Sequence, residues 1–141
     1  MKGNYTMNKI RILAVDDEEG VLNVIKSICR NHEVTAETSP LKALEIIRKE
    51  KFDIFIIDYQ MPVINGIELL EKIQNEYESR HHVSIFCTAF GTIHLFKTEL
   101  LQGLFDFFIE KPFEINTLKD VMKKSILLLG NIRNKYKKYN I

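Results

Sequence analysis

The segment 52–66 limits the possible fold more than any other part of the chain. An apolar run of strand length at 54–57 ends directly in the carboxylate of Asp58. A loop that contains Pro62 and Gly66 follows, and a new amphipathic segment begins at Ile67. Because an isolated buried charge is costly, we expect Asp58 to lie at the carboxyl edge of a sheet, where loops can hold a cation beside it.

Strands and helices are predicted to alternate along the whole chain. Apolar runs of strand length occur at 10–15, 33–38, 53–58, 83–88 and 105–109, and each is followed by a segment with helical spacing of apolar residues. The strands are nearly continuous apolar runs, which is typical of a parallel sheet covered by helices on both faces. The sequence therefore predicts a doubly wound α/β domain with five strands and five helices.

Chemically reactive side chains follow four of the predicted strands. Asp16 and Asp17 come after the first, Asp58 after the third, Thr88 after the fourth and Lys111 after the fifth. The carboxyl ends of parallel strands meet at one edge of the sheet, so these groups should converge. Clustered carboxylates favour a hard divalent cation such as Mg²⁺, and an aspartate beside it can act as a nucleophile toward phosphorus.

The motifs around these residues resemble the receiver domains of two-component response regulators, such as the chemotaxis regulators. They are Val15-Asp16-Asp17, Asp58 with Met61-Pro62 and Gly66, Thr88-Ala89, and Lys111-Pro112-Phe113. The resemblance covers roughly residues 9–129. It implies a flavodoxin-like sheet with the strand order 2-1-3-4-5.

The resemblance also implies a role for each site residue. Asp58 would be the phosphoacceptor, and Mg²⁺, with Mn²⁺ able to substitute, would be bound by Asp17, Asp58 and the backbone carbonyl of Gln60. Asp16 would act through metal-bound water, and Lys111 and Thr88 would contact the phosphoryl group. Thr88 and an aromatic residue would form the switch, while Gln60 and Phe90 would tune the lifetime of the phosphorylated state.

The switch aromatic is expected to be Phe108, three residues before Lys111. The spacing from Thr88 to Lys111 is one residue longer than expected, so Phe107 is the alternative. The family implies a phosphoryl donor that is a histidine kinase or a phosphotransfer protein. The chain would catalyse only its own phosphorylation and dephosphorylation, and phosphorylation would change the surface of the fourth helix, fifth strand and fifth helix.

Composition restricts location and partners. No apolar run approaches the roughly 20 residues of a membrane span. Residues 1–8, an expected flexible lead, lack the apolar core of a signal peptide, which favours the cytoplasm. Eight basic residues against two acidic ones follow from Lys111 onward, although the net charge of the chain is only +1. We interpret this basic end as a solvated linker rather than a nucleic-acid site, and expect a downstream protein target or an attached output domain.

The C-terminal end has two interpretations. In one, the domain spans 9–129, Gly130 caps the last helix, and 130–141 form a basic tail. In the other, the helix continues, because apolar or small residues recur at heptad spacing. Two surfaces are then candidates for a homodimer: the extended last helix, or the surface of the fourth helix, fifth strand and fifth helix. The pattern comprises Ile115, Leu118, Met122, Ser125, Leu129, Ile132, Tyr136 and Tyr139. The adjacent His81 and His82 are predicted to lie in a surface loop.

Two other classes of function share parts of this pattern. A Mg²⁺-dependent phosphohydrolase could form an aspartyl phosphate, but it would need a second acid or base near Asp58, where the sequence offers Gln60. A flavodoxin-like cofactor-binding module would need a phosphate-binding loop after the first strand. The chain instead has four acidic residues there, at 16–19, which would repel a phosphate.

Overall fold

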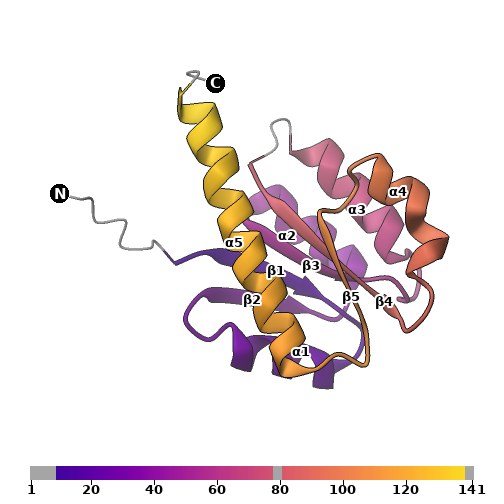
Figure 1. Cartoon of the computed structure of the whole chain (residues 1–141). Coiled ribbons are helices and arrows are strands. Elements are labelled where there is room, and N and C mark those ends of the chain that lie inside the picture. The colour runs from indigo at the N-terminus through magenta and orange to yellow at the C-terminus, as the bar shows by residue number, and fades with distance from the viewer. Residues whose placement is uncertain (1–8, 78–80, 139–141) are drawn as a thin grey trace.

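A five-stranded parallel sheet forms the centre of the computed structural model, which describes residues 9–77 and 81–138 (Figure 1). The strands are β1 (Arg11–Val15), β2 (Glu33–Glu37), β3 (Ile54–Asp58), β4 (Val83–Ala89) and β5 (Phe107–Lys111). They lie in the order β2-β1-β3-β4-β5, and every neighbouring pair is parallel. The predicted flavodoxin-like topology is therefore confirmed.

Helices cover both faces of the sheet. Helices α1 (Glu19–Ile28) and α5 (Ile115–Lys138) lie on one face, and α2 (Pro40–Lys49) and α3 (Gly66–Glu76) on the other. A short 3₁₀ turn, η1 (Ile93–Phe96), leads into α4 (Lys97–Leu101). Because neighbouring strand residues point into opposite apolar layers, β1 and β3 are buried on both sides, which explains their continuous apolar sequences. No helix in the described ranges is long and apolar enough to cross a membrane.

Local sequence signals fix two of the helix starts. The Asn65 side chain accepts a hydrogen bond from the Glu68 amide at 2.9 Å, and the Glu68 carboxylate accepts one from the Asn65 amide at 3.1 Å. This capping box begins α3 directly after the loop that follows Asp58. Ser39 caps α2 through the Lys42 amide, with Pro40 at the first helical position.

The fifth strand begins two residues later than predicted. The sequence predicts a strand at 105–109, whereas β5 spans Phe107–Lys111. Phe105 precedes the strand, yet its ring is buried and stacks on Phe86 with the centroids 4.8 Å apart. Phe105 thus packs into the core from the loop before β5, and its apolar side chain gives it the sequence pattern of a strand residue.

Helix α5 continues past Gly130 to Lys138, and its last turns contact the opposite edge of the sheet from Asp58. Arg133 forms an ion pair with Asp53, and the ring of Tyr136 stacks on His81 at 4.3 Å. Leu118, Met122, Ser125 and Leu129 of the heptad pattern are buried within the domain. Those heptad positions therefore serve packing within the chain, and Tyr139 lies outside the described residues.

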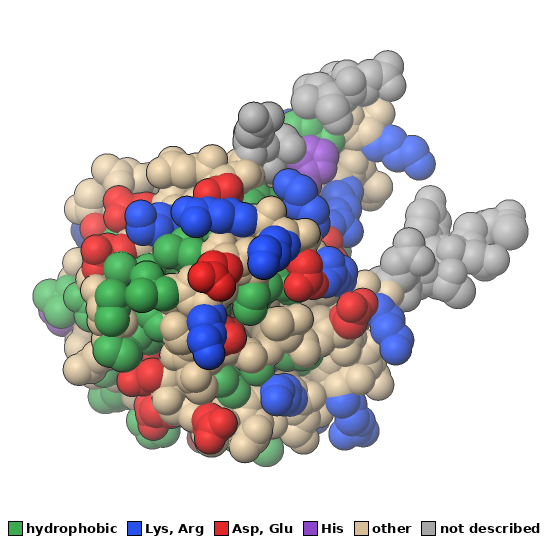
Figure 2. All heavy atoms as spheres, turned by 180° about the vertical axis from the view of Figure 1, so that it is seen from behind, with side chains coloured by type: hydrophobic (Ala, Val, Ile, Leu, Met, Phe, Trp, Pro, Cys, Tyr) green, Lys and Arg blue, Asp and Glu red, His purple; other side chains and the backbone are tan. Residues whose placement is uncertain are grey.

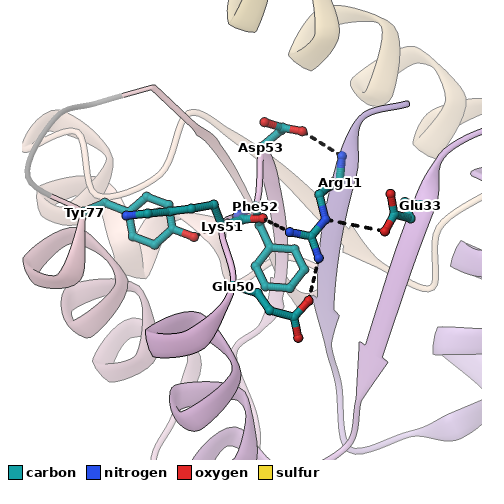
Figure 3. Close-up of polar contacts among 7 residues, drawn as sticks. All are labelled: Arg11, Glu33, Glu50, Lys51, Phe52, Asp53 and Tyr77. Carbon is teal, nitrogen blue, oxygen red and sulfur yellow. Dashed lines mark hydrogen bonds and ion pairs between the residues drawn. The ribbon is translucent and has the colours of Figure 1, made fainter. Parts of the chain in front are cut away.

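A network of polar contacts surrounds the N-terminal ends of β1 and β3 (Figure 3). The Asp53 carboxylate accepts a hydrogen bond from the Arg11 amide at 2.7 Å, and the Arg11 guanidinium pairs with Glu33 at 3.5 Å and with Glu50. The Tyr77 hydroxyl accepts a hydrogen bond from the Phe52 amide at 2.9 Å. These contacts join the starts of β1 and β3 to the ends of α2 and α3.

His82 is buried, so the prediction of a surface loop for it is wrong. Only 6% of the residue is exposed, and its ring lies edge-on to Phe55 and Tyr77 with centroids 5.4 and 5.0 Å away. The residue immediately precedes β4, where the chain enters the core. An imidazole presents an apolar body with a polar tip, and here aromatic rings surround that body.

Candidate functional site

The sheet order brings the reactive residues together at the carboxyl edge. Asp16 directly follows β1, Asp58 ends β3, Thr88 lies in β4 and Lys111 ends β5. The register places Asp58 beside Cys87 and Ala89 beside Lys111, so β4 and β5 end level with each other, two residues beyond the end of β3. The side chains of Asp16, Asp58 and Thr88 are almost fully buried, each residue having 4% or less of its surface exposed.

The ammonium group of Lys111 is the centre of the site. Its Nζ lies 2.8 Å from Asp16 Oδ2, 3.1 Å from Asp58 Oδ1 and 3.2 Å from Glu18 Oε1. The other Asp16 oxygen accepts a hydrogen bond from the Glu18 amide at 2.9 Å. One cation thus holds two buried carboxylates and one exposed carboxylate in contact with it.

The electrostatics of this cluster raise three pKa values. Burial, the largest cause, and the charge of Asp16 together raise the pKa of Asp58 to about 6, against the lowering effect of Lys111. Burial also raises the pKa of Asp16. Burial alone would lower the pKa of Lys111, but its hydrogen bond to Asp16 and the charge of Asp58 together hold it well above its usual range. At neutral pH, Asp58 is therefore ionised and Lys111 is charged.

The raised pKa of Asp58 predicts that Asp58→Asn stabilises the metal-free protein. A folded-state pKa of about 6 against an ordinary value of 3.8 means that stability present below pH 3.8 is lost as the pH rises through 6. Asparagine does not ionise, so at pH 7.5 in EDTA the free energy of unfolding of the variant should exceed that of wild type by about 2 kcal/mol. This difference in the free energy of unfolding should fall below about 1 kcal/mol near pH 4.

Urea unfolding at both pH values measures this difference, and Asp120→Asn is the control because Asp120 is exposed on α5. If Asp58→Asn were less stable than wild type at pH 7.5, the conclusion that ionised Asp58 destabilises the metal-free protein would be wrong.

Exposed acidic side chains and an apolar wall surround the buried centre. Ligand oxygens of Asp16, Asp17 and Glu18 can all lie within 4.8 Å of one another. A cleft of about 1030 Å³ opens beside Asp58 and Lys111. Its lining includes Asp17, Gln60 and Thr88, together with apolar side chains of α1, η1 and the loop after β5: Val21, Val24, Leu95, Phe96, Pro112 and Phe113.

Thr88 lines the cleft, but its hydroxyl is bonded away from the carboxylates. Thr88 Oγ1 lies 2.7 Å from Thr92 Oγ1. Gln60 also lines the cleft with an exposed side chain, whereas Phe90 is outside the lining and 79% exposed.

The two candidate aromatic residues point to opposite faces of the sheet. Phe107 packs in the layer under α1 and α5. Phe108 is the register partner of Phe86, so it shares the face covered by α3 and η1, and 39% of it is exposed at the edge of the sheet. Phe108 is the more exposed of the two side chains.

Gly66 allows the backbone after Asp58 to approach α3 closely. A Cβ atom at this position would lie 2.2 Å from the Asp58 carbonyl oxygen. We expect Gly66→Ala to lower the free energy of unfolding by about 2 kcal/mol, because backbone must shift to admit the methyl group. Gly20→Ala is the control, since its added Cβ would meet nothing within 4 Å. Equal denaturant midpoints for the two variants would contradict this expectation.

Sequence reasoning missed two partners of the predicted residues. The sequence shows Glu18 only as part of the acidic run 16–19, whereas in the structure its carboxylate lies 3.2 Å from the Lys111 ammonium. Thr92 bonds the hydroxyl of Thr88, and its position four residues later in an irregular segment gave no pattern to detect.

Fold and site together define a class: a doubly wound domain with an acidic cluster, a hydroxyl and a lysine at the carboxyl edge of its sheet. The chain also matches the response regulator receiver domain family over residues 12–123. It therefore belongs to that family, and it is a receiver domain of two-component signalling.

Known proteins support this membership. The chain is 28% identical over 123 residues to sporulation initiation phosphotransferase F of Bacillus subtilis, covering 86% of this chain and 97% of that protein. It is 30% identical to the chemotaxis protein CheY-3 of Vibrio cholerae, covering 84% and 93%. A CheY-like receiver domain structure from Methanospirillum hungatei is 26% identical, with a TM-score of 0.77 and coverage of 91% and 99%. Some other relatives are longer, and the chain spans 19% to 54% of their lengths.

Proposed function

We propose that Asp58 accepts a phosphoryl group from a phosphohistidine of a histidine kinase or a phosphotransfer protein. The observation that carries this proposal is the buried Asp58 carboxylate, 3.1 Å from the Lys111 ammonium and beside an open cleft. A carboxylate oxygen of Asp58 forms the new bond to phosphorus, and the bond from phosphorus to the histidine nitrogen breaks with its electron pair left on nitrogen. The product is an acyl phosphate.

The donor set fits a magnesium ion. Asp17, Asp58 and the backbone carbonyl of Gln60 would hold it, and Asp16 would contact its bound water. The support for this is the acidic cluster of Asp16, Asp17 and Glu18 at the same edge, whose ligand oxygens lie within 4.8 Å of one another. Such carboxylate oxygens are ligands that Mg²⁺ prefers and that Mn²⁺ also accepts. When bound, the ion neutralises phosphoryl oxygens and thereby supports attack by the carboxylate. Lys111 stays close to Asp58 and can pair with a phosphoryl oxygen.

Phosphorylation would then change the surface next to Thr88. The Thr88 hydroxyl would turn toward the phosphoryl group, and Phe108 would move inward from the edge of β5. Gln60 and Phe90 would limit the access of water to the acyl phosphate and so tune its lifetime. Figure 2 shows hydrophobic side chains gathered where η1 and α4 lie, and Leu95 and Leu101 of these elements are 65% and 78% exposed.

We infer the partners of the chain from its exposed surfaces. The apolar wall of the cleft would receive the phosphodonor, and the exposed face of α4, β5 and α5 would contact a target protein, an output domain or a second copy of the chain. The end of α5 contributes less to a dimer, because Tyr136 stacks on the chain's own His81. We place these events in the cytoplasm, without direct binding of nucleic acid. The reaction is stoichiometric, so the chain would not act as an enzyme on other substrates.

The phosphohydrolase alternative has less support. Gln60 is not an acid or base, and Lys111 already bridges Asp58 to Asp16. The flavin alternative meets the acidic groups of Asp16, Asp17 and Glu18 where a phosphate would bind.

Intact-mass spectrometry after incubation with Mg²⁺ and acetyl phosphate tests the proposal. The protein should gain one phosphoryl group that is labile at alkaline pH, and EDTA should prevent the gain. Steady release of phosphate from many phosphate esters without a labelled intermediate would favour the phosphohydrolase instead. No labelling and no turnover under any of these conditions would overturn the proposed function.

A further inference from the structure

Two threonines and a backbone carbonyl form a short hydrogen-bonded chain at the end of β4. Thr88 Oγ1 lies 2.7 Å from Thr92 Oγ1, and Thr92 Oγ1 donates to the Ala89 carbonyl oxygen at 2.6 Å. A threonine hydroxyl has one proton, and a carbonyl oxygen only accepts. Thr92 therefore donates its proton to Ala89, so Thr88 must be the donor in the contact between the two hydroxyls. The Thr88 proton is committed to Thr92.

The position of Thr92 is fixed by its surroundings. Its amide donates a second hydrogen bond to the Ala89 carbonyl at 3.1 Å. The loop before it is joined to the end of β5, because the Phe90 amide donates to the Lys111 carbonyl at 3.0 Å and the Gly91 amide to the Glu110 carboxylate at 2.6 Å. Gly91 has a φ of 78°, a left-handed conformation that suits glycine. Thr92 thus presents a fixed acceptor to Thr88.

We propose that Thr92 is a positioning residue that holds the switch in its resting state. It accepts the hydrogen bond of the Thr88 hydroxyl, and activation requires that hydroxyl to donate to a phosphoryl oxygen on Asp58 instead. This inference rests on the proposed function. A charged phosphoryl oxygen is a stronger acceptor than a neutral hydroxyl, by roughly twofold in bond strength. After phosphorylation, the Thr88 hydroxyl can therefore exchange its hydrogen bond to Thr92 for one to a phosphoryl oxygen. The free energy of the lost bond to Thr92 is subtracted from the free energy gained with the phosphoryl group.

Replacing Thr92 by valine tests the proposal, because valine keeps the shape of threonine and removes the hydroxyl. The Ala89 carbonyl retains the hydrogen bond from the amide of residue 92. The measured quantity is the Kd of the full chain for beryllofluoride, a phosphoryl mimic, at saturating Mg²⁺, followed by amide chemical shifts. Loss of one competing hydrogen bond should tighten binding by roughly fivefold in Thr92→Val. Thr92→Ser, which restores the hydroxyl, should return the Kd toward the wild-type value.

A double-mutant cycle separates this role from a general effect on folding. In a Thr88→Val background there is no hydroxyl proton to hold, so Thr92→Val should no longer change the Kd for beryllofluoride. An unchanged Kd in Thr92→Val alone, or the same tightening in both backgrounds, overturns the role of Thr92 while leaving the proposed function intact. A wild-type protein that binds Mg²⁺ but not beryllofluoride overturns the proposed function and this inference with it.

Discussion

Replacement of Asp58 by asparagine is expected to abolish covalent labelling by acetyl phosphate, whereas wild type should gain one phosphoryl group in the presence of Mg²⁺. An amide oxygen is a poor nucleophile, and the amide does not carry the charge that Lys111 now contacts at 3.1 Å. The change is nearly isosteric, so the loss would not arise from a collapsed site. Intact-mass spectrometry over a time course measures the labelled fraction.

Two features of this experiment make it decisive. The pH dependence described above predicts that Asp58→Asn is more stable than wild type at neutral pH, so loss of labelling would coincide with a gain in stability. Asp120→Asn, an exposed position on α5, is the control and should label like wild type. Labelling of Asp58→Asn at the wild-type rate would mean that another residue is the acceptor.

Replacement of Lys111 by methionine is expected to have the largest effect on stability. Lys111 is the cation shared by the buried Asp16 and Asp58, and its side chain is 19% exposed. Removing one partner of a buried ion pair leaves uncompensated charge, so the free energy of unfolding at pH 7.5 in EDTA should fall by about 2 to 4 kcal/mol. Urea unfolding measures this loss.

The loss should depend on pH and on metal. Without Lys111, the pKa values of Asp16 and Asp58 rise further, so the variant should recover stability as the pH falls and both carboxylates take up protons. Added Mg²⁺ should restore part of the stability at pH 7.5, because it supplies positive charge to the same oxygens. Lys119→Met, exposed on α5, is the control. Equal losses in the two lysine variants would contradict the central role of Lys111.

The sequence predicts those site residues that stand at the ends of strands, because a parallel sheet determines where they lie. Each reactive residue follows an apolar strand, and the strand ends of one parallel sheet share an edge, so the sequence predicts that Lys111 converges with Asp16 and Asp58. The structure adds the direct contacts of Lys111 with both carboxylates. The contacts of Glu18 and Thr92 depend on loop conformation. Loops have no periodicity, and these two partners could be found only from the structure.

Long-range packing limited the rest of the prediction. His82 looks polar in sequence, but aromatic rings of β3 and the end of α3 enclose it. Phe105 looks like a strand residue, but it packs from a turn. Past Gly130, Ile132 of α5 packs against the core, and Arg133 pairs with Asp53, 80 residues earlier. Helix propensity near Gly130 argues for an end there, and tertiary contacts override it.

Borohydride reduction of the labelled protein tests the identity of the acceptor most directly. Borohydride converts an aspartyl phosphate to homoserine, and peptide mass spectrometry then locates the altered residue. After treatment with Mg²⁺ and acetyl phosphate, homoserine is expected at position 58 and at no other aspartate. Homoserine at 16, 17 or elsewhere, or a phosphoryl group that resists reduction because it lies on a hydroxyl or an imidazole, would contradict the assignment of Asp58.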